Sequence, residues 1–266
     1  MRSRGGLAGR WSEDARWDVR SRGEILAAWV AALVFGMSAQ AFPFTPGSVP
    51  VHGPPVPVVR TAAAVVPVST VVQTEVAGGA RTVALTFDDG PDPRWTPQVL
   101  DLLGRYGAVA TFCLVGDNVD RHPDLVRRVV DAGMRLCHHT QHHDTQDADG
   151  SAQEIAERVG PMQHRLEELG GRPVAWFRAP AGYWTDPLTA VVAADGMQPL
   201  GWSVDSGDWR RPGVAAIVST VQQQLHPGAV VLLHDGGGSR EQTVAALEQL
   251  LPWLVDHCYA FGFPGP

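Results

Sequence analysis

Two adjacent carboxylates, Asp88 and Asp89, follow a short apolar run and precede a Gly-Pro turn. Like charges repel, and burial at the end of a strand makes either group costly to ionise. A bound cation would neutralise this repulsion. One acid would then hold the metal, and the other would be free to take a proton from the metal-bound water. The pair therefore indicates a site for metal-assisted hydrolysis.

The histidine-rich segment HHTQHH supplies two further candidate ligands, His139 and His143. Residues four apart on one turn of helix face the same way. Two imidazoles and one carboxylate form a common open zinc site, with a position left for water. An isolated pair of this spacing is more often an exposed helix face. Together with Asp89, however, the pair predicts bound Zn²⁺ or another divalent cation.

The elements that position these residues alternate between short apolar strands and amphipathic helices. Strands are expected at residues 82–87, 110–115, 134–137, 175–178, 198–203, 229–233 and 259–263. Helices are expected at residues 96–106, 123–132, 151–169, 187–194, 214–225 and 241–256. This alternation predicts an α/β fold of parallel strands with helical crossovers. Seven expected strands within residues 82–263 favour a closed or nearly closed barrel.

Ionisable residues follow several of the expected strands. They are Asp88 and Asp89, the histidines of residues 138–143, Arg178, Asp205 with Asp208, and His234 with Asp235. In a barrel of parallel strands the loops at the carboxyl ends converge on one site. We therefore expect these side chains to gather at one rim of the barrel.

Five motifs, TFDDGP, HTQHH, FRAP, DSGDW and LLHD, occur in this order along the chain. As a set they resemble the five motifs of the polysaccharide deacetylases, the NodB-homology domain of carbohydrate esterase family four. The resemblance extends from Arg81 to about Phe263. It implies a distorted (β/α)7-type barrel with its active site at the C-terminal strand ends. It also implies a divalent metal, usually zinc, and the removal of acetyl groups from N-acetylated or O-acetylated sugars.

The resemblance assigns the metal ligands and the base to the first three motifs. The implied metal ligands are Asp89, His139 and His143. Asp88 is the implied general base. Arg178 would pair with Asp88 and keep it ionised and oriented, and a purely structural salt bridge is the alternative.

The remaining motifs carry the implied acid and substrate contacts. His234 matches the general acid, and Asp205 matches the carboxylate that orients His234 and favours its charged form. Substrate-binding positions are implied for Pro180, Ala181, Trp209 and Leu232. Ala181 stands where the family often has Tyr. The family uses the backbone N–H at that position as an oxyanion donor, and a backbone donor survives a change of side chain.

The chain contains three cysteines. Cys113 and Cys137 lie on neighbouring expected strands, and export would permit a disulfide between them. Two buried thiols are the alternative. Cys258 is expected to be buried in the last helix, and it lacks a visible base partner that would make it a nucleophile.

The N-terminal region has the features of an export signal and a linker. Arginines precede an apolar run at residues 25–37, which is followed by Ser38-Ala39-Gln40-Ala41. This pattern predicts a secretory signal at residues 1–41, with an uncleaved anchor as the alternative. Residues 42–79, rich in Pro and Val, are expected to form an extended linker. Residues 80–266 would then form the catalytic domain.

Composition narrows the function classes further. The formal net charge is −7 and no basic block interrupts it, which argues against a nucleic-acid partner. The leading hypothesis is a secreted or wall-located, monomeric deacetylase of N-acetylated glycans such as peptidoglycan, chitin or their oligomers. No stable membrane span is expected after signal cleavage. Alternatives are an O-acetyl esterase on xylan, a hydrolase of small amides, and a catalytically silent module that binds wall glycans.

Overall fold

The computed structural model describes residues 68–76 and 81–265. The expected signal at residues 1–41 and most of the expected linker lie outside these ranges. Among the described residues, no helix has both the length and the apolarity that a membrane crossing requires.

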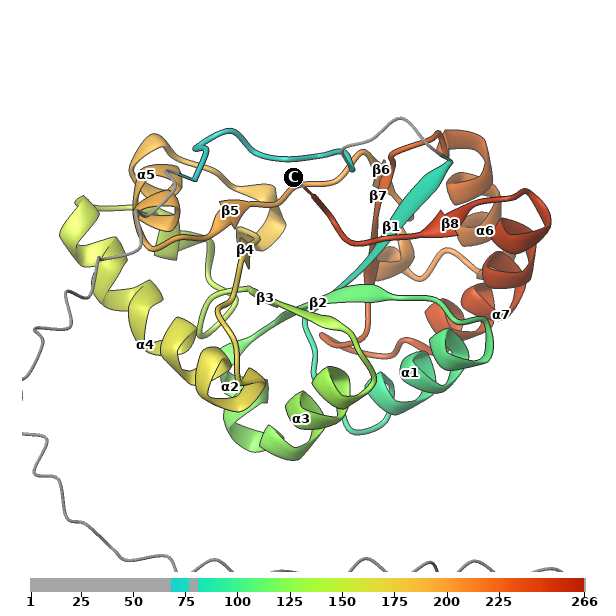
Figure 1. The fold of residues 1–266 in the computed structure, drawn as a ribbon, viewed down its shortest axis with the longest axis horizontal. Helices are drawn as coiled ribbons and strands as arrows, with labels where there is room; N and C mark the ends of the chain where they lie inside the picture. Colours follow the sequence, from blue (N-terminus) through green and yellow to red (C-terminus); the bar gives the residue numbers. More distant parts are fainter. Residues whose placement is uncertain (1–67, 77–80, 266) are drawn as a thin grey trace, which may run out of the picture. The chain divides into compact units, whose positions relative to one another are not determined.

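The described residues form one curved sheet of parallel strands surrounded by helices (Figure 1). The strands are β1 (Thr82–Asp88), β2 (Ala110–Leu114), β3 (Arg135–His138), β4 (Trp176–Phe177), β5 (Gln198–Pro199), β6 (Val204–Asp205), β7 (Val230–His234) and β8 (Ala260–Phe261). Their order is β5-β4-β3-β2-β1-β7-β6, and β8 pairs with β1. The predicted α/β barrel-type fold of parallel strands is therefore confirmed.

The helices lie between successive strands, as the crossover pattern predicts. They are α1 (Thr96–Arg105), α2 (Gly116–Arg121), α3 (Pro123–Asp131), α4 (Ala152–Gly170), α5 (Asp186–Ala194), α6 (Val214–Gln224) and α7 (Glu241–Asp256). Short 3-10 turns occupy Thr145–Ala148, Pro180–Gly182 and Asp208–Arg210. Helix α4 begins with a capping box, in which Ser151 and Glu154 satisfy each other's backbone N–H groups. The short helix α2 was not expected from the sequence.

Alternation along β1 decides which of its side chains face the site. Val83, Leu85 and Phe87 are buried in the main core with residues of the surrounding helices. Ala84 instead belongs to a smaller buried cluster that includes Cys113, Cys137 and Leu200. Successive side chains of a strand point to opposite faces, so Thr86 and Asp88 lie on the same face as Ala84. Asp88 is thereby directed toward the inner side of the curved sheet.

The expected strand at residues 198–203 is divided in the structure. The chain leaves β5 after Pro199 and enters β6 at Val204, and these two strands are the opposite ends of the sheet order. β5 and β6 do not pair with each other, so the sheet is open between them. We call this opening the seam. Residues 68–76 lie at this seam, and Gln73 forms a parallel bridge with Leu200.

The two alternatives for the cysteines are resolved in favour of a disulfide between Cys113 and Cys137. These residues are direct partners in the register of β2 and β3. Cys258 is exposed and follows α7 with a φ of 58°, so the expectation that it is buried in the last helix was wrong.

Candidate active site

Asp89, His139 and His143 converge at the carboxyl end of the sheet. Asp89 Oδ1 lies 3.6 Å from His139 Nε2 and 3.3 Å from His143 Nε2. One ligand atom from each residue can be chosen so that all three lie within 4.8 Å of one another. Ligands of a tetrahedral zinc ion, each bound at about 2.0–2.2 Å, are separated by roughly 3.3–3.6 Å. The spacing of these side chains therefore fits one shared cation.

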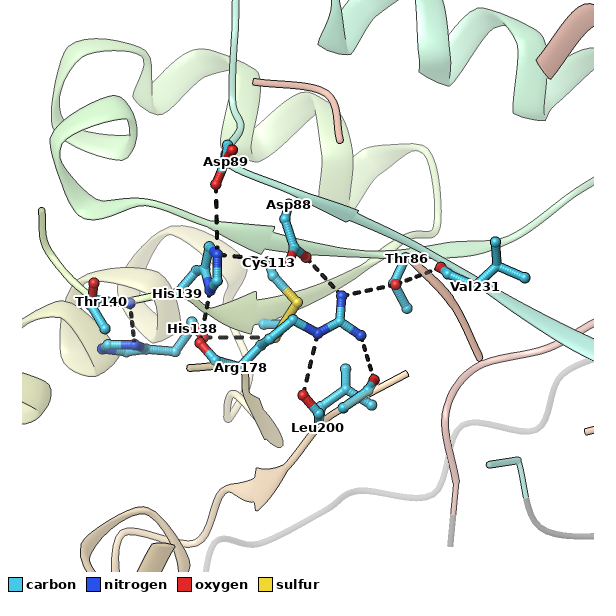
Figure 2. Close-up of a disulfide and its surroundings, with 12 residues drawn as sticks. Thr86, Asp88, Asp89, Cys113, His138, His139, Thr140, Arg178, Leu200 and Val231 are labelled. Carbon is cyan, nitrogen blue, oxygen red and sulfur yellow. Dashed lines mark hydrogen bonds and ion pairs between the residues drawn. A yellow bond between two sulfur atoms is a disulfide. The ribbon is translucent and has the colours of Figure 1, made fainter. Parts of the chain in front are cut away.

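Two further observations support a cation at this position. Asp89 Oδ1 is buried and accepts no hydrogen bond from the described residues, which is uncommon for a buried carboxylate. His139 Nδ1 lies 2.7 Å from the carbonyl oxygen of Arg178. If Nδ1 donates this bond, Nε2 is left with its lone pair directed toward Asp89 (Figure 2). Asp89 Oδ1 and His139 Nε2 are therefore both available to bind a metal ion.

The two histidines do not share a helical turn, so that part of the prediction was wrong. They lie in a loop after β3 in which Thr140 and His143 have φ angles of 61° and 57°. The Thr140 N–H donates to His138 Nδ1, and the His143 N–H donates to Thr140 Oγ1. These local bonds compete with helix formation and bring the two imidazole rings to a centroid distance of 4.9 Å.

His138 is a structural residue of this loop. It is fully buried, stacks on Phe177 and has Nε2 3.1 Å from the carbonyl oxygen of Val159. Burial lowers the pKa of His138 to about 3, so the ring is neutral at physiological pH. His138 therefore does not replace His139 as a ligand.

Asp88 is held by Arg178. Asp88 Oδ1 accepts a 2.7 Å hydrogen bond from Arg178 Nη1, and both side chains are almost completely buried. The same Nη1 donates to Thr86 Oγ1 at 2.9 Å. Asp88 Oδ2 lies 3.7 Å from His139 Nε2, on the side of the metal ligands. One carboxylate oxygen is thus occupied by Arg178, and the other faces the candidate metal position.

The residue that orients His234 is Asp208, so the assignment of this role to Asp205 was wrong. Asp208 Oδ1 lies 2.8 Å from His234 Nδ1, and Oδ2 accepts hydrogen bonds from the His234 N–H and the Thr243 hydroxyl. Asp205 Oδ1 instead accepts from the Gly207 N–H at 2.9 Å. The turn at Gly207, with a φ of 68°, directs Asp208 rather than Asp205 beneath the imidazole.

The environment of His234 favours its charged form. Burial by itself lowers the pKa of His234, but the hydrogen bond and negative charge of Asp208, together with the charges of Asp88 and Asp89, outweigh burial. The net effect is a raised pKa. Nδ1 faces Asp208, so Nε2 is the ring nitrogen that can deliver a proton.

Comparison with known proteins of similar sequence identifies the family of this chain. A family model for polysaccharide deacetylases matches residues 75–200. The chain is 41% identical over 189 residues to the peptidoglycan-N-acetylglucosamine deacetylase of Bacillus cereus, covering 70% of this chain and 88% of that protein. The chain belongs to the polysaccharide deacetylase family. The family resemblance drawn from the five motifs is therefore confirmed.

Two further relatives extend the comparison. The family member described here is 39% identical over 191 residues to the chitooligosaccharide deacetylase of Sinorhizobium fredii, covering 67% of this chain and 87% of that protein. A solved structure from Bacillus anthracis, a pseudoenzyme of carbohydrate esterase family four, superposes with a TM-score of 0.68 at 26% identity. That match covers 74% of this chain and 68% of the solved chain.

A cavity of about 550 Å³ joins the candidate catalytic groups of this deacetylase-family domain. It is lined by the three candidate metal ligands, Asp88, Asp205 and His234. Ala181, Trp209 and Leu232, for which substrate contacts were expected, also line it, whereas Pro180 is not among the lining residues. Trp202 and Arg240, which lie outside the five motifs, also line the cavity, and Arg240 was not predicted from the sequence.

The residues that line this cavity include an exposed tryptophan and a residue with a left-handed backbone. Trp209 is 47% exposed, and the Arg210 guanidinium lies 4.2 Å from its ring centroid. Ala181 adopts a left-handed backbone, with a φ of 53°, which is uncommon for a residue other than glycine. An open, partly apolar cavity of this kind can accept the acetyl group of a sugar.

Proposed function

We propose that this protein is a metal-dependent deacetylase that removes acetyl groups from N-acetylated sugars of a polysaccharide. One observation carries the proposal. An Asp-His-His cluster, an Arg-held carboxylate and an Asp-held imidazole all face one cavity. The substrate would be peptidoglycan, chitin or their oligomers, because the two curated relatives above act on peptidoglycan and chitooligosaccharides. We also propose that the protein acts outside the cytoplasm, as the N-terminal pattern predicts.

The residues that would hold the metal are Asp89, His139 and His143. A divalent cation bound there would polarise the acetyl carbonyl and lower the pKa of a bound water. Zn²⁺ is our proposal for the metal, because two imidazoles and a carboxylate suit it.

Asp88 would act as the general base. Its Oδ1 is occupied by Arg178, so Oδ2 is the oxygen that accepts the proton of the attacking water. Arg178 keeps the carboxylate in place because a planar guanidinium holds it through a fixed, charge-assisted bond. The Ala181 N–H, at the cavity wall, is our proposed donor to the oxygen of the tetrahedral species.

His234 would act as the general acid. An amine leaves only when it is protonated, and His234 Nε2 is free to supply that proton while Asp208 binds Nδ1. In the order β3-β2-β1-β7, β1 with its two carboxylates lies between the loop of the metal histidines and His234. Base and acid therefore come from different strands and retain separate positions. The products would be acetate and a free amino sugar.

Acetate release from N-acetylated chitooligosaccharides, from peptidoglycan and from O-acetylated xylan tests this proposal. We expect release from at least one N-acetylated substrate, loss of release with a chelator, and recovery when Zn²⁺ is restored. Release from xylan alone would support the esterase. Glycan binding that ignores the chelator, with no acetate from any substrate, would support a silent module, an alternative that the pseudoenzyme neighbour keeps open.

A further inference from the structure

Residues 71–76, here called the strap, cross the seam between the two ends of the sheet (Figure 1). Gln73 forms a parallel bridge with Leu200, just beyond β5. Glu75 forms an antiparallel bridge with Ala229, just before β7. The strap thus adds a strand-like segment where the numbered strands leave the barrel open.

The strap holds the backbone of residues 199–201 by direct hydrogen bonds. The Gln73 N–H donates to the Pro199 carbonyl at 2.8 Å, and the Gly201 N–H donates to the Gln73 carbonyl at 2.7 Å. On its other side the same stretch is held by β4, because the Leu200 N–H donates to the Phe177 carbonyl at 2.8 Å. The stretch is therefore fixed between the strap and the sheet.

Two carbonyls of this fixed stretch orient Arg178. Arg178 Nε donates to the Leu200 carbonyl at 3.2 Å, and Nη2 donates to the Gly201 carbonyl at 2.8 Å (Figure 2). A guanidinium is planar and rigid, so two bonds on one edge set the direction of the third nitrogen. That nitrogen, Nη1, binds Asp88 at 2.7 Å.

The far end of the strap is held as firmly. The Val76 N–H donates to the Gly228 carbonyl at 2.7 Å, and the Val76 side chain packs on the inner buried cluster. Trp202 packs on the same cluster, and its ring lies 5.6 Å from the Arg178 guanidinium carbon. The strap therefore covers the inner cluster as well as pairing with the backbone that holds Arg178.

We propose that the strap is a positioning element of the catalytic site, acting through residues 199–201 and Arg178 on Asp88. The catalytic domain would then begin within the stretch expected to be linker. This inference rests on the proposed function only for the role of Asp88 as base. The docking of the strap is independent of that role and can be measured separately.

Gly201 offers a sharp test in the full-length protein, because the strap approaches it closely. A Cβ at this position would lie 2.9 Å from Val72 Cγ1 and 3.0 Å from Thr74 Cγ2. Gly201→Ala should therefore displace the strap or the 199–201 backbone. We expect kcat to fall about tenfold with KM little changed, because small misplacements of catalytic groups slow the reaction strongly. The content of bound metal should remain as in the wild type.

A compensating variant separates positioning from general damage. Val72→Ala with Thr74→Ser removes the two methyl groups that the new Cβ would meet. Combined with Gly201→Ala, this pair should restore most of the lost kcat, and the pair alone should behave like the wild type. Thr70→Ala, at an exposed position just before the strap, serves as a neutral control.

Gln73→Pro tests the pairing of the strap with residues 199–201 and leaves Gly201 in place. It therefore still tests the proposal if the Gly201→Ala protein fails to fold. It removes the N–H that donates to Pro199, so we expect the same loss of kcat. Unchanged kcat in both Gly201→Ala and Gln73→Pro, or no recovery in the compensated variant, would overturn the proposal.

Amide hydrogen exchange distinguishes a failure of the strap proposal from a failure of the proposed function. In the wild type the Gly201 amide should be protected, and Gly201→Ala or Gln73→Pro should speed exchange of the neighbouring amides. Exchange of the wild-type Gly201 amide at the rate of an unstructured chain would overturn the docked strap. Absence of acetate release by the wild type, with that amide protected, would overturn the proposed function and leave strap docking supported.

Discussion

Asp208 Oδ1 lies 2.8 Å from His234 Nδ1, while Asp208 Oδ2 binds the His234 backbone N–H. The same carboxylate therefore holds both the ring and the main chain of the proposed general acid. Asp205 is a part of the same motif but makes neither contact, and this difference can be tested by substitution.

We predict that Asp208→Asn lowers kcat by about a hundredfold or more, within the range for losing general acid catalysis. The neutral amide removes the charge that raises the pKa of His234. His234 must be protonated to act, and a lower pKa leaves it protonated only at lower pH. The alkaline limb of the kcat profile should therefore move to lower pH. Asp205→Asn is the matched control and should leave this limb in place, whereas a shift of equal size in both variants would contradict our assignment.

Substitutions at the metal cluster should separate metal binding from proton transfer. Asp88→Asn should retain bound metal yet lose about 10²–10⁴-fold in kcat, because the base is removed while all three candidate ligands remain. His139→Ala should lose both the metal and the activity. Elemental analysis of the purified proteins, with acetate release, measures both effects.

His142→Ala provides the control for this series, since His142 is exposed and pairs with Asp117 rather than with the candidate ligands. It should retain metal and activity. In the wild type, added Zn²⁺ should raise the thermal midpoint, because a ligand that binds only the folded state stabilises it. Full turnover by Asp88→Asn would remove Asp88 as the base.

Asp235 should make the folded state less stable as the pH rises. Burial raises the pKa of Asp235 from 3.8 to about 7, and one of its oxygens accepts no hydrogen bond from the described residues. Between these two pH values the unfolded chain ionises this group while the folded chain keeps it protonated. The free energy of unfolding therefore falls as pH rises from about 4 to 7, by at most about 4 kcal/mol for this group.

Asp235→Asn should remove this contribution while keeping an acceptor for the Thr96 hydroxyl, which now binds Asp235 at 2.5 Å. Urea unfolding at pH 5 and pH 8, with the same metal concentration, measures the difference. We expect the variant to lose less stability between the two pH values than the wild type does. An equal loss in both proteins would show that Asp235 titrates no differently on folding.

The Cys113–Cys137 disulfide should contribute about 3 kcal/mol to the free energy of unfolding, as expected for a cross-link between residues 24 apart. Cys113→Ala with Cys137→Ala should lower the denaturant midpoint accordingly. Cys258→Ala is the control, since Cys258 is exposed and free. If the double variant matches the wild type under oxidising conditions, the cross-link adds no stability.

Much of the site follows from local sequence. Asp88 and Asp89 stand at the end of an apolar run whose alternation places Asp88 on the inner face, and parallel strands bring their carboxyl ends to one rim. His139, His143 and His234 follow other such strands, and their chemistry indicates metal binding and proton transfer wherever they meet. Strand and helix alternation likewise predicts the parallel sheet with helical crossovers.

Other features depend on contacts between residues distant in the sequence, and local pattern does not specify these. The resemblance assigned Asp205 as the partner of His234, but the turn at Gly207 places Asp208 there instead. The loop after β3 places two histidines together without a helix. The strand expected at residues 198–203 is divided by the seam, because β5 at its start and β6 just beyond its end pair with different strands at opposite ends of the sheet.

The sequence by itself determined the residue chemistry, the order of the motifs and the parallel α/β architecture. Residue types and short-range periodicity carry that information. Only the tertiary structure decided that Asp208 holds His234, that Cys113 and Cys137 are joined, and that the strap pairs with residues 199–201. These outcomes depend on packing and backbone direction across the barrel, where a shift of a few ångströms selects one partner over another.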